Sequence, residues 1–114
     1  MSEEVLLYER VGKVGKVILN RPKVRNALNQ KLVESLGDAI RQADADPETN
    51  VIVLCAAGDK AFTAGFDLKE SIGEPIVDVP ARRENSLMEL NNWRAIWEAK
   101  KPVIGSVQGY CIGG

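Results

Sequence analysis

Apolar residues recur at helical spacing between residues 29 and 45. The side of this stretch opposite the apolar positions is charged, so the pattern predicts an amphipathic helix. Asn26 or Asn29 is expected to cap its start, and Asp46-Pro47 is expected to end it. The predicted apolar face consists of Leu32, Val33, Leu36, Ala39, Ile40 and Ala43.

A second helix is predicted from about Pro80 to Lys100, because proline is tolerated at a first helical position and Pro102 ends the pattern. Before it, residues 71–79 contain glycine and proline and are expected to form a surface loop. The predicted apolar face of this helix carries Leu87, Leu90, Trp93 and Trp97.

Four apolar runs have the length and composition of strands. Residues 5–10 and 16–20 alternate around a glycine-containing stretch, which indicates an antiparallel hairpin with its turn at residues 11–15. Residues 51–56 form a continuous β-branched run, typical of a strand buried on both faces of a parallel sheet, and residues 103–107 form another. The order β-β-α-β-α-β predicts an α/β layered fold with a largely parallel inner sheet.

A glycine-bearing turn follows two of these predicted strands, at residues 61–70 and at residues 108–114. Glycine lets a backbone approach a ligand closely and leaves N–H groups free to point outward. Two N–H donors converging from separate turns are the minimum for an oxyanion hole. Ordinary strand-to-helix turns are the alternative interpretation at this point.

The composition narrows the chemistry. The 114 residues have a formal net charge of −1 and 27% charged residues, so no strong field favours nucleic acid or an anionic membrane surface. The longest apolar run is too short to span a bilayer. There is no histidine, which excludes histidine-based triads and metal sites within this chain. We expect a cytoplasmic protein, since residues 1–20 show no secretory signal and Cys55 and Cys111 are interpreted as a reduced, buried pair.

Together with the stretch from Asn20 to Asn29 (NRPKVRNALN), the two turns resemble the enoyl-CoA hydratase/isomerase, or crotonase, superfamily. The three motifs occur in the family's order, and the lead-in Lys101-Pro102-Val103-Ile104 also fits. The resemblance implies a crotonase-like (ClpP/crotonase) fold of repeated β-β-α units. It implies that residues 1–114 are the N-terminal part of one acyl-CoA-binding domain.

The resemblance also implies the roles of individual residues. The backbone N–H groups of Phe66 and Gly114 would form the oxyanion hole for the thioester carbonyl, while Lys23 and Arg25 would lie near the nucleotide phosphates. No cofactor or metal is implied, since coenzyme A is part of the substrate. The implied substrate-binding residues are Lys23, Arg25, Ala27, Ala64, Gly65, Phe66, Asp67, Leu68, Lys69, Gly113 and Gly114.

Simple structural roles are expected for other side chains near the motifs. Asp67 is expected to order its own turn or the following helix rather than to act as an acid. Tyr110 is expected to be packed with its hydroxyl bonded. The large side chain of Phe66 would reshape the acyl pocket without affecting its backbone N–H.

The family's catalytic glutamates lie beyond Gly114, so the 114 residues alone are expected to be inactive. The missing half would also supply trimer-forming helices, so a homotrimer or a dimer of trimers is expected for the whole protein. Helix faces bearing Leu36, Ile40, Trp93 and Trp97 are expected to be partly uncovered. A fragment, or an incompletely represented longer protein, is favoured over a true short product.

Several functions remain open from the sequence. Hydratase or isomerase is the default, and a dehalogenase, decarboxylase or thioester hydrolase would share the oxyanion hole. A non-catalytic CoA-binding or subunit-pairing module is the second hypothesis. An unrelated α/β nucleotide-binding domain is disfavoured, because neither GxGxxG nor GxxxxGK[ST] occurs.

Overall fold

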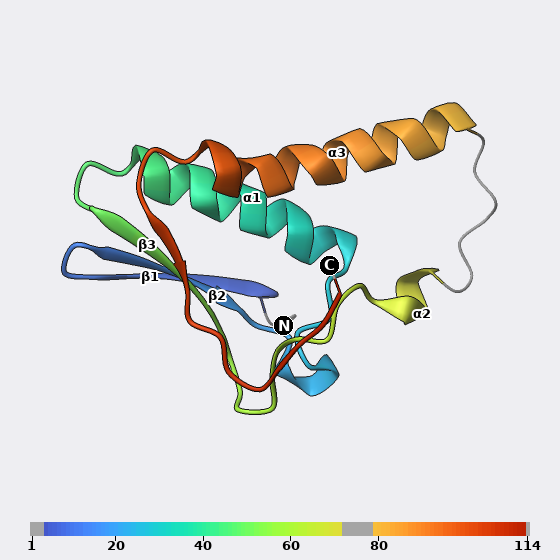
Figure 1. Cartoon of the computed structure of the whole chain (residues 1–114), viewed down its shortest axis with the longest axis horizontal. Coiled ribbons are helices and arrows are strands. Elements are labelled where there is room, and N and C mark those ends of the chain that lie inside the picture. The colour runs from blue at the N-terminus through green and yellow to red at the C-terminus, as the bar shows by residue number, and fades with distance from the viewer. Residues whose placement is uncertain (1–3, 72–78, 114) are drawn as a thin grey trace.

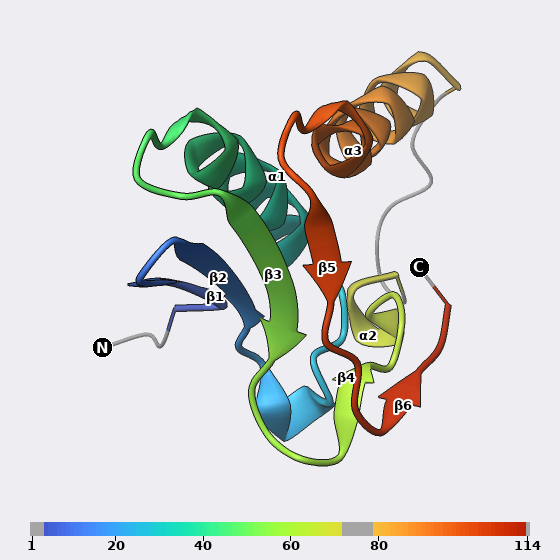
Figure 2. The ribbon, with the colours of Figure 1, turned by 60° about the vertical axis from the view of Figure 1, so that its left-hand side comes forward.

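The computed structural model describes residues 4–71 and 79–113. A sheet in the order β1-β2-β3-β5 carries the helices α1 and α3 on one face (Figures 1 and 2). β2, β3 and β5 are parallel, and β1 pairs antiparallel with β2, which confirms the predicted hairpin and parallel inner sheet. The strands of this sheet are β1 (Leu6–Val11), β2 (Val14–Leu19), β3 (Val51–Ala56) and β5 (Val103–Gly105).

The hairpin turn is tighter than predicted. Val11 pairs with Val14, so only Gly12 and Lys13 connect the strands, and residues 11, 14 and 15 belong to the ladder. Gly12 has a φ of 59°, a left-handed conformation that glycine adopts without strain. The prediction that residues 11–15 form the turn was therefore too wide.

Helix α1 (Gln30–Ala45) forms the core with β2 and β3, and its predicted apolar face is confirmed. The Asn29 side chain accepts a hydrogen bond from the Leu32 N–H at 2.8 Å, so Asn29 rather than Asn26 is the N-cap. Leu36 and Ile40 are 2% and 0% exposed, so the expectation that they would be uncovered is wrong. They belong to one core cluster with Val17 and Leu19 of β2 and Ile52 of β3.

Helix α3 (Val79–Glu98) packs on α1, but not through its predicted face. Its buried residues are Asn92 and Ala95. A Cβ added to Gly37 of α1 would lie 2.8 Å from the Asn92 Cγ, so the helices approach each other closely at this glycine. Of the predicted face, Trp93 packs partly against the core, whereas the other members are exposed: Leu87 (55%), Leu90 (50%) and Trp97 (89%).

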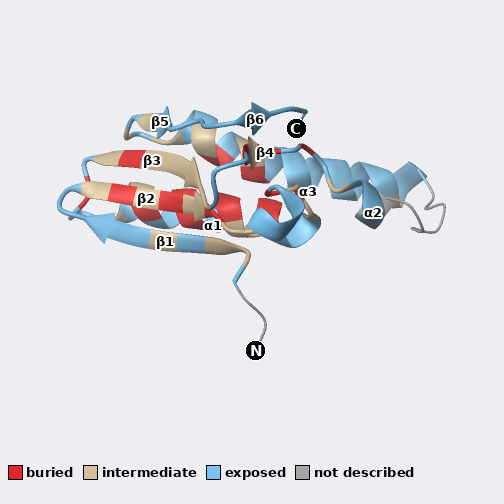
Figure 3. Cartoon of the chain, turned by 90° about the horizontal axis from the view of Figure 1, so that it is seen from below, coloured by how far each residue is buried: buried red, intermediate tan, exposed pale blue. Residues whose placement is uncertain are grey.

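Burial falls off across the sheet from β2 to β5 (Figure 3). β2 alternates between buried and half-buried positions, β3 is fully buried only at Ile52, and Ile104 of β5 is 53% exposed. The prediction that residues 51–56 are buried on both faces is therefore wrong for the described residues. Cys111 is exposed and Cys55 half-buried, which also corrects the expectation of a buried pair.

Short elements complete the described chain. They are the 3₁₀ helix η1 (Pro22–Val24), the strands β4 (Ala61–Thr63) and β6 (Tyr110–Cys111), and the single-turn helix α2 (Leu68–Ser71). Most of the loop predicted at residues 71–79, with Gly73 and Pro75, lies outside the described residues. In the described part of the chain, no helix is both long and apolar enough to cross a bilayer.

Candidate functional site

The two glycine turns predicted from the sequence lie side by side (Figure 2). β4 and β6 pair in parallel, and the N–H of Ile112 donates to the Thr63 carbonyl at 3.1 Å. A Cβ added to Gly65 would lie 2.6 Å from the Ile112 carbonyl oxygen and 3.4 Å from the Gly113 Cα. The two backbones are therefore in contact, and at Gly65 no larger residue fits without displacement.

The third motif lies along the first turn. The N–H of Leu28 donates to the Gly65 carbonyl at 2.7 Å, and the Asp67 N–H donates to the Leu28 carbonyl at 2.9 Å. Because the C=O and N–H of a trans peptide point in opposite directions, the bond from Leu28 directs the Phe66 N–H away from Leu28. Within residues 4–71 and 79–113, this N–H makes no backbone hydrogen bond.

Asp67 orders the end of the first turn, as expected. One carboxylate oxygen accepts the Lys69 N–H at 3.0 Å, at the start of α2, and the other lies 3.1 Å from the Arg21 Nη2. The two side chains of this ion pair are 18% and 15% exposed. Arg21 lies within the Asn20–Asn29 motif, but the sequence analysis assigned it no contact.

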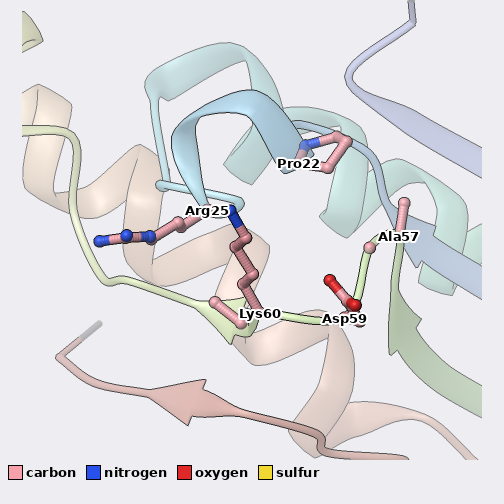
Figure 4. A pocket seen from close by; sticks show the side chains of 7 residues that line it. Pro22, Arg25, Ala57, Asp59 and Lys60 are labelled. Carbon is pink, nitrogen blue, oxygen red and sulfur yellow. The ribbon is translucent and has the colours of Figure 1, made fainter.

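A hollow of about 140 Å³ adjoins the first turn where β3 leads into β4 (Figure 4). Lys60 extends across it toward the segment that ends in Arg25, whereas the end of the Arg25 side chain extends away from it, and Asp59 also lines the hollow. Lys23 lines a different hollow, with Val5 and residues 20–24. The structure therefore brings Arg25 but not Lys23 to this hollow. It adds Lys60, which is absent from the substrate-binding residues implied by the sequence.

Most of the remaining predicted site residues gather along the first turn. Ala64, Leu68 and Lys69 are exposed and Ala27 is half-buried, while Phe66 is 45% exposed. On the second turn, Gly113 has a φ of 63°. A Cβ added to Gly113 would lie 3.5 Å from the Gly65 Cα. Gly114, the second predicted oxyanion donor, lies outside the described residues. Tyr110 is 59% exposed, so the expectation that it is packed is wrong.

Comparison with known proteins identifies the family. The profile of the enoyl-CoA hydratase/isomerase family matches residues 9–114. A probable enoyl-CoA hydratase of Rhizobium meliloti (strain 1021) is 43% identical over all of this chain and 42% of its own length. The mitochondrial enoyl-CoA hydratase of Pongo abelii is 40% identical over 97% of this chain and 37% of its own length.

Solved structures agree with the sequence comparisons. The crystal structure of an enoyl-CoA hydratase/carnithine racemase from Magnetospirillum magneticum superposes with a TM-score of 0.87 and 30% identity, over 98% of this chain and 42% of that one. The chain therefore spans less than half the length of the relatives it matches, and it has the corresponding part of the crotonase fold. The chain belongs to the enoyl-CoA hydratase/isomerase family.

Proposed function

We propose that the protein carrying this chain is an acyl-CoA enzyme, an enoyl-CoA hydratase or isomerase. The observation that carries the proposal is the contact between Gly65 and Gly113. Beside this contact, the Phe66 N–H points away from Leu28, which bonds to the Gly65 carbonyl. A thioester carbonyl placed there would accept the N–H of Phe66 and, as the family resemblance implies, that of Gly114. The two donors would stabilise the negative charge that develops on the carbonyl oxygen when the substrate becomes enolate-like.

The rest of the substrate would follow the first turn. Ala64, Leu68 and Lys69 are exposed along it, and Arg25 and Lys60 lie at the adjoining hollow, where cations would meet the phosphates of coenzyme A. We expect the acid–base carboxylates of the reaction to lie past residue 114, together with the surfaces that form a homotrimer or a dimer of trimers. In this proposal the 114 residues bind the thioester and polarise it, and do not complete hydration alone.

The test compares two substitutions at Gly114 in the whole protein that carries this chain. Gly114→Pro removes the N–H, whereas Gly114→Ala keeps it. Turnover of a short trans-2-enoyl-CoA, followed by the loss of its conjugated absorbance, should fall about 10²–10³-fold in the proline variant. Wild-type turnover in the proline variant would contradict the assignment, and an equal loss in both variants would remove the N–H as its explanation.

The hollow that Lys60 crosses gives a separate prediction. Lys60→Gln should weaken the binding of coenzyme A in calorimetry, and the effect should shrink at high salt, because exposed charges are screened. Lys13→Gln is the matched control, since Lys13 lies at the tip of the β1–β2 hairpin and is 64% exposed. Equal affinities of the two variants would show that the phosphates bind elsewhere.

A further inference from the structure

Asn26 is a buried amide whose hydrogen bonds converge on the segment that leads into the first turn. It is 0% exposed and has a left-handed φ of 55°. Its Oδ1 accepts the Arg21 N–H at 2.8 Å, and its Nδ2 donates to the carbonyls of Ala57 and Ala61 at 3.0 Å each. Ala57 directly follows β3 and Ala61 begins β4, so one side chain closes the connection between the two strands.

A threonine continues this network to the turn itself. The Thr63 hydroxyl donates to the Asn26 carbonyl at 2.8 Å and accepts the Gly65 N–H at 3.1 Å. The Gly65 carbonyl is held by Leu28, as described above. Both polar backbone groups of Gly65 are therefore fixed, and the plane of the Gly65–Phe66 peptide is fixed with them.

Arg21 holds the other end of the turn. Its Nη1 donates to the Ala27 carbonyl at 2.5 Å while its Nη2 pairs with Asp67. The guanidinium thus ties the strand-like segment at residues 27–28 to the residue after Phe66. Charge-assisted bonds of this kind, largely shielded from water, are stronger than neutral ones and orient what they join.

We propose that Asn26 and Arg21 are positioning residues for the thioester-polarising N–H of Phe66. Asn26 acts through Thr63 and Arg21 acts through Asp67, and Asn26 is too deeply buried to touch a ligand. The inference rests on the proposed function. Since neither residue supplies the contacts that we assign to coenzyme A, their loss lowers kcat and leaves the affinity for coenzyme A nearly unchanged.

The first experiment replaces Asn26 by glycine, which accepts the left-handed backbone and removes the amide. Asn92→Ala is the matched control, because Asn92 is also buried, at 8% exposure, and bonds to the Met88 carbonyl within α3 and to Arg41 of α1. With a trans-2-enoyl-CoA substrate, kcat should fall about tenfold to a hundredfold in Asn26→Gly, the range expected for a misplacement near 1 Å. KM should change less than threefold, and Asn92→Ala should keep the wild-type kcat.

A second pair keeps the test decisive if Asn26→Gly fails to fold. Arg21→Lys retains the charge but cannot reach Ala27 and Asp67 with a fork of two nitrogens. Arg41→Lys is its control, since the Arg41 guanidinium likewise bonds a carbonyl, that of Asn91, and a carboxylate, that of Asp38. We expect the kcat loss in Arg21→Lys and not in Arg41→Lys.

A spectroscopic signature separates positioning from simple loss of structure. Bound cinnamoyl-CoA should absorb at longer wavelength in the wild-type protein, because two N–H donors polarise its conjugated carbonyl. The shift should shrink in Asn26→Gly and Arg21→Lys at saturating ligand and persist in both controls. A wild-type protein without the shift overturns the proposed function and this inference with it. A wild-type shift that both Asn26→Gly and Arg21→Lys retain, or that the controls also lose, overturns this inference alone.

Discussion

The two glycine turns of this site are held in different ways. The first, at residues 61–67, is bonded along its length to residues 21–28, through backbone pairs, a buried amide and an ion pair. The described part of the second, residues 108–113, is exposed throughout; backbone bonds to Lys60 and Thr63 hold it, together with a bond from the Gln108 side chain to the Gly58 carbonyl. The turn that carries the proposed Phe66 donor is thus held by many contacts within the described residues, whereas the described part of the second turn is held by few.

The largest effect is expected from a substitution at Gly65, where the two turns are in contact. Gly65 has a φ of 92°, and an added Cβ would collide with the Ile112 carbonyl, so Gly65→Ala combines backbone strain with overpacking. The free energy of unfolding should fall by about 2–5 kcal/mol, the sum of the two effects, and binding of coenzyme A thioesters should be lost. Urea unfolding and calorimetry check both results.

Gly12→Ala is the matched control for Gly65→Ala. Gly12 also has a positive φ, but no atom of the described residues lies within 4 Å of an added Cβ. It should show the strain alone, about 1–2 kcal/mol. Equal losses of unfolding free energy in Gly12→Ala and Gly65→Ala would mean that the contact between the turns adds nothing to the cost of the Gly65 substitution.

A smaller effect is expected from removing the hydroxyl that links the first turn to Asn26. Thr63→Val keeps the shape of the side chain but leaves the Gly65 N–H and the Asn26 carbonyl without their partner. We expect a loss of about 1–3 kcal/mol in the free energy of unfolding, measured in urea. Thr49→Val removes an equally buried hydroxyl at the far end of α1 and should leave thioester affinity intact. An unchanged stability of Thr63→Val would argue against the network.

The smallest effect belongs to the second turn. Ile112 is 57% exposed, so Ile112→Ala should change the unfolding free energy by less than about 0.5 kcal/mol. Thermal unfolding would measure it. A loss above 2 kcal/mol would show that this turn is packed more firmly than its exposure indicates.

The sequence predicted the elements whose pattern is long and local. Helix α1 followed from apolar residues at helical spacing, because one face of it is buried within the chain. Helix α3 followed equally well in extent, yet its apolar residues did not identify its buried face. It meets α1 through Asn92 and Ala95, where Gly37 permits close approach, and no periodicity in α3 reports a glycine on another helix.

The two glycine turns were predicted from the sequence, but the side chains that hold the first turn in place were not. β4 and β6 are three and two residues long, too short to show any alternation. Asn26 was considered only as a helix cap. Its bonds to Ala57 and Ala61 were missed because they join positions more than thirty residues apart in the sequence. Arg21 and Lys60 were equally invisible as partners, because their roles come from chain segments that meet only in the fold.

The most direct measurement removes the backbone N–H of Phe66 and keeps its side chain. Replacing Phe66 by phenyllactic acid exchanges its backbone N–H for an ester oxygen and keeps the side chain. The infrared band of a ¹³C-labelled thioester carbonyl, bound to the naturally expressed protein, should lie at lower wavenumber than in water and should return toward the free position in the ester variant. An unchanged band, with the ligand bound in both proteins, would contradict the role of the Phe66 N–H and with it the proposed site.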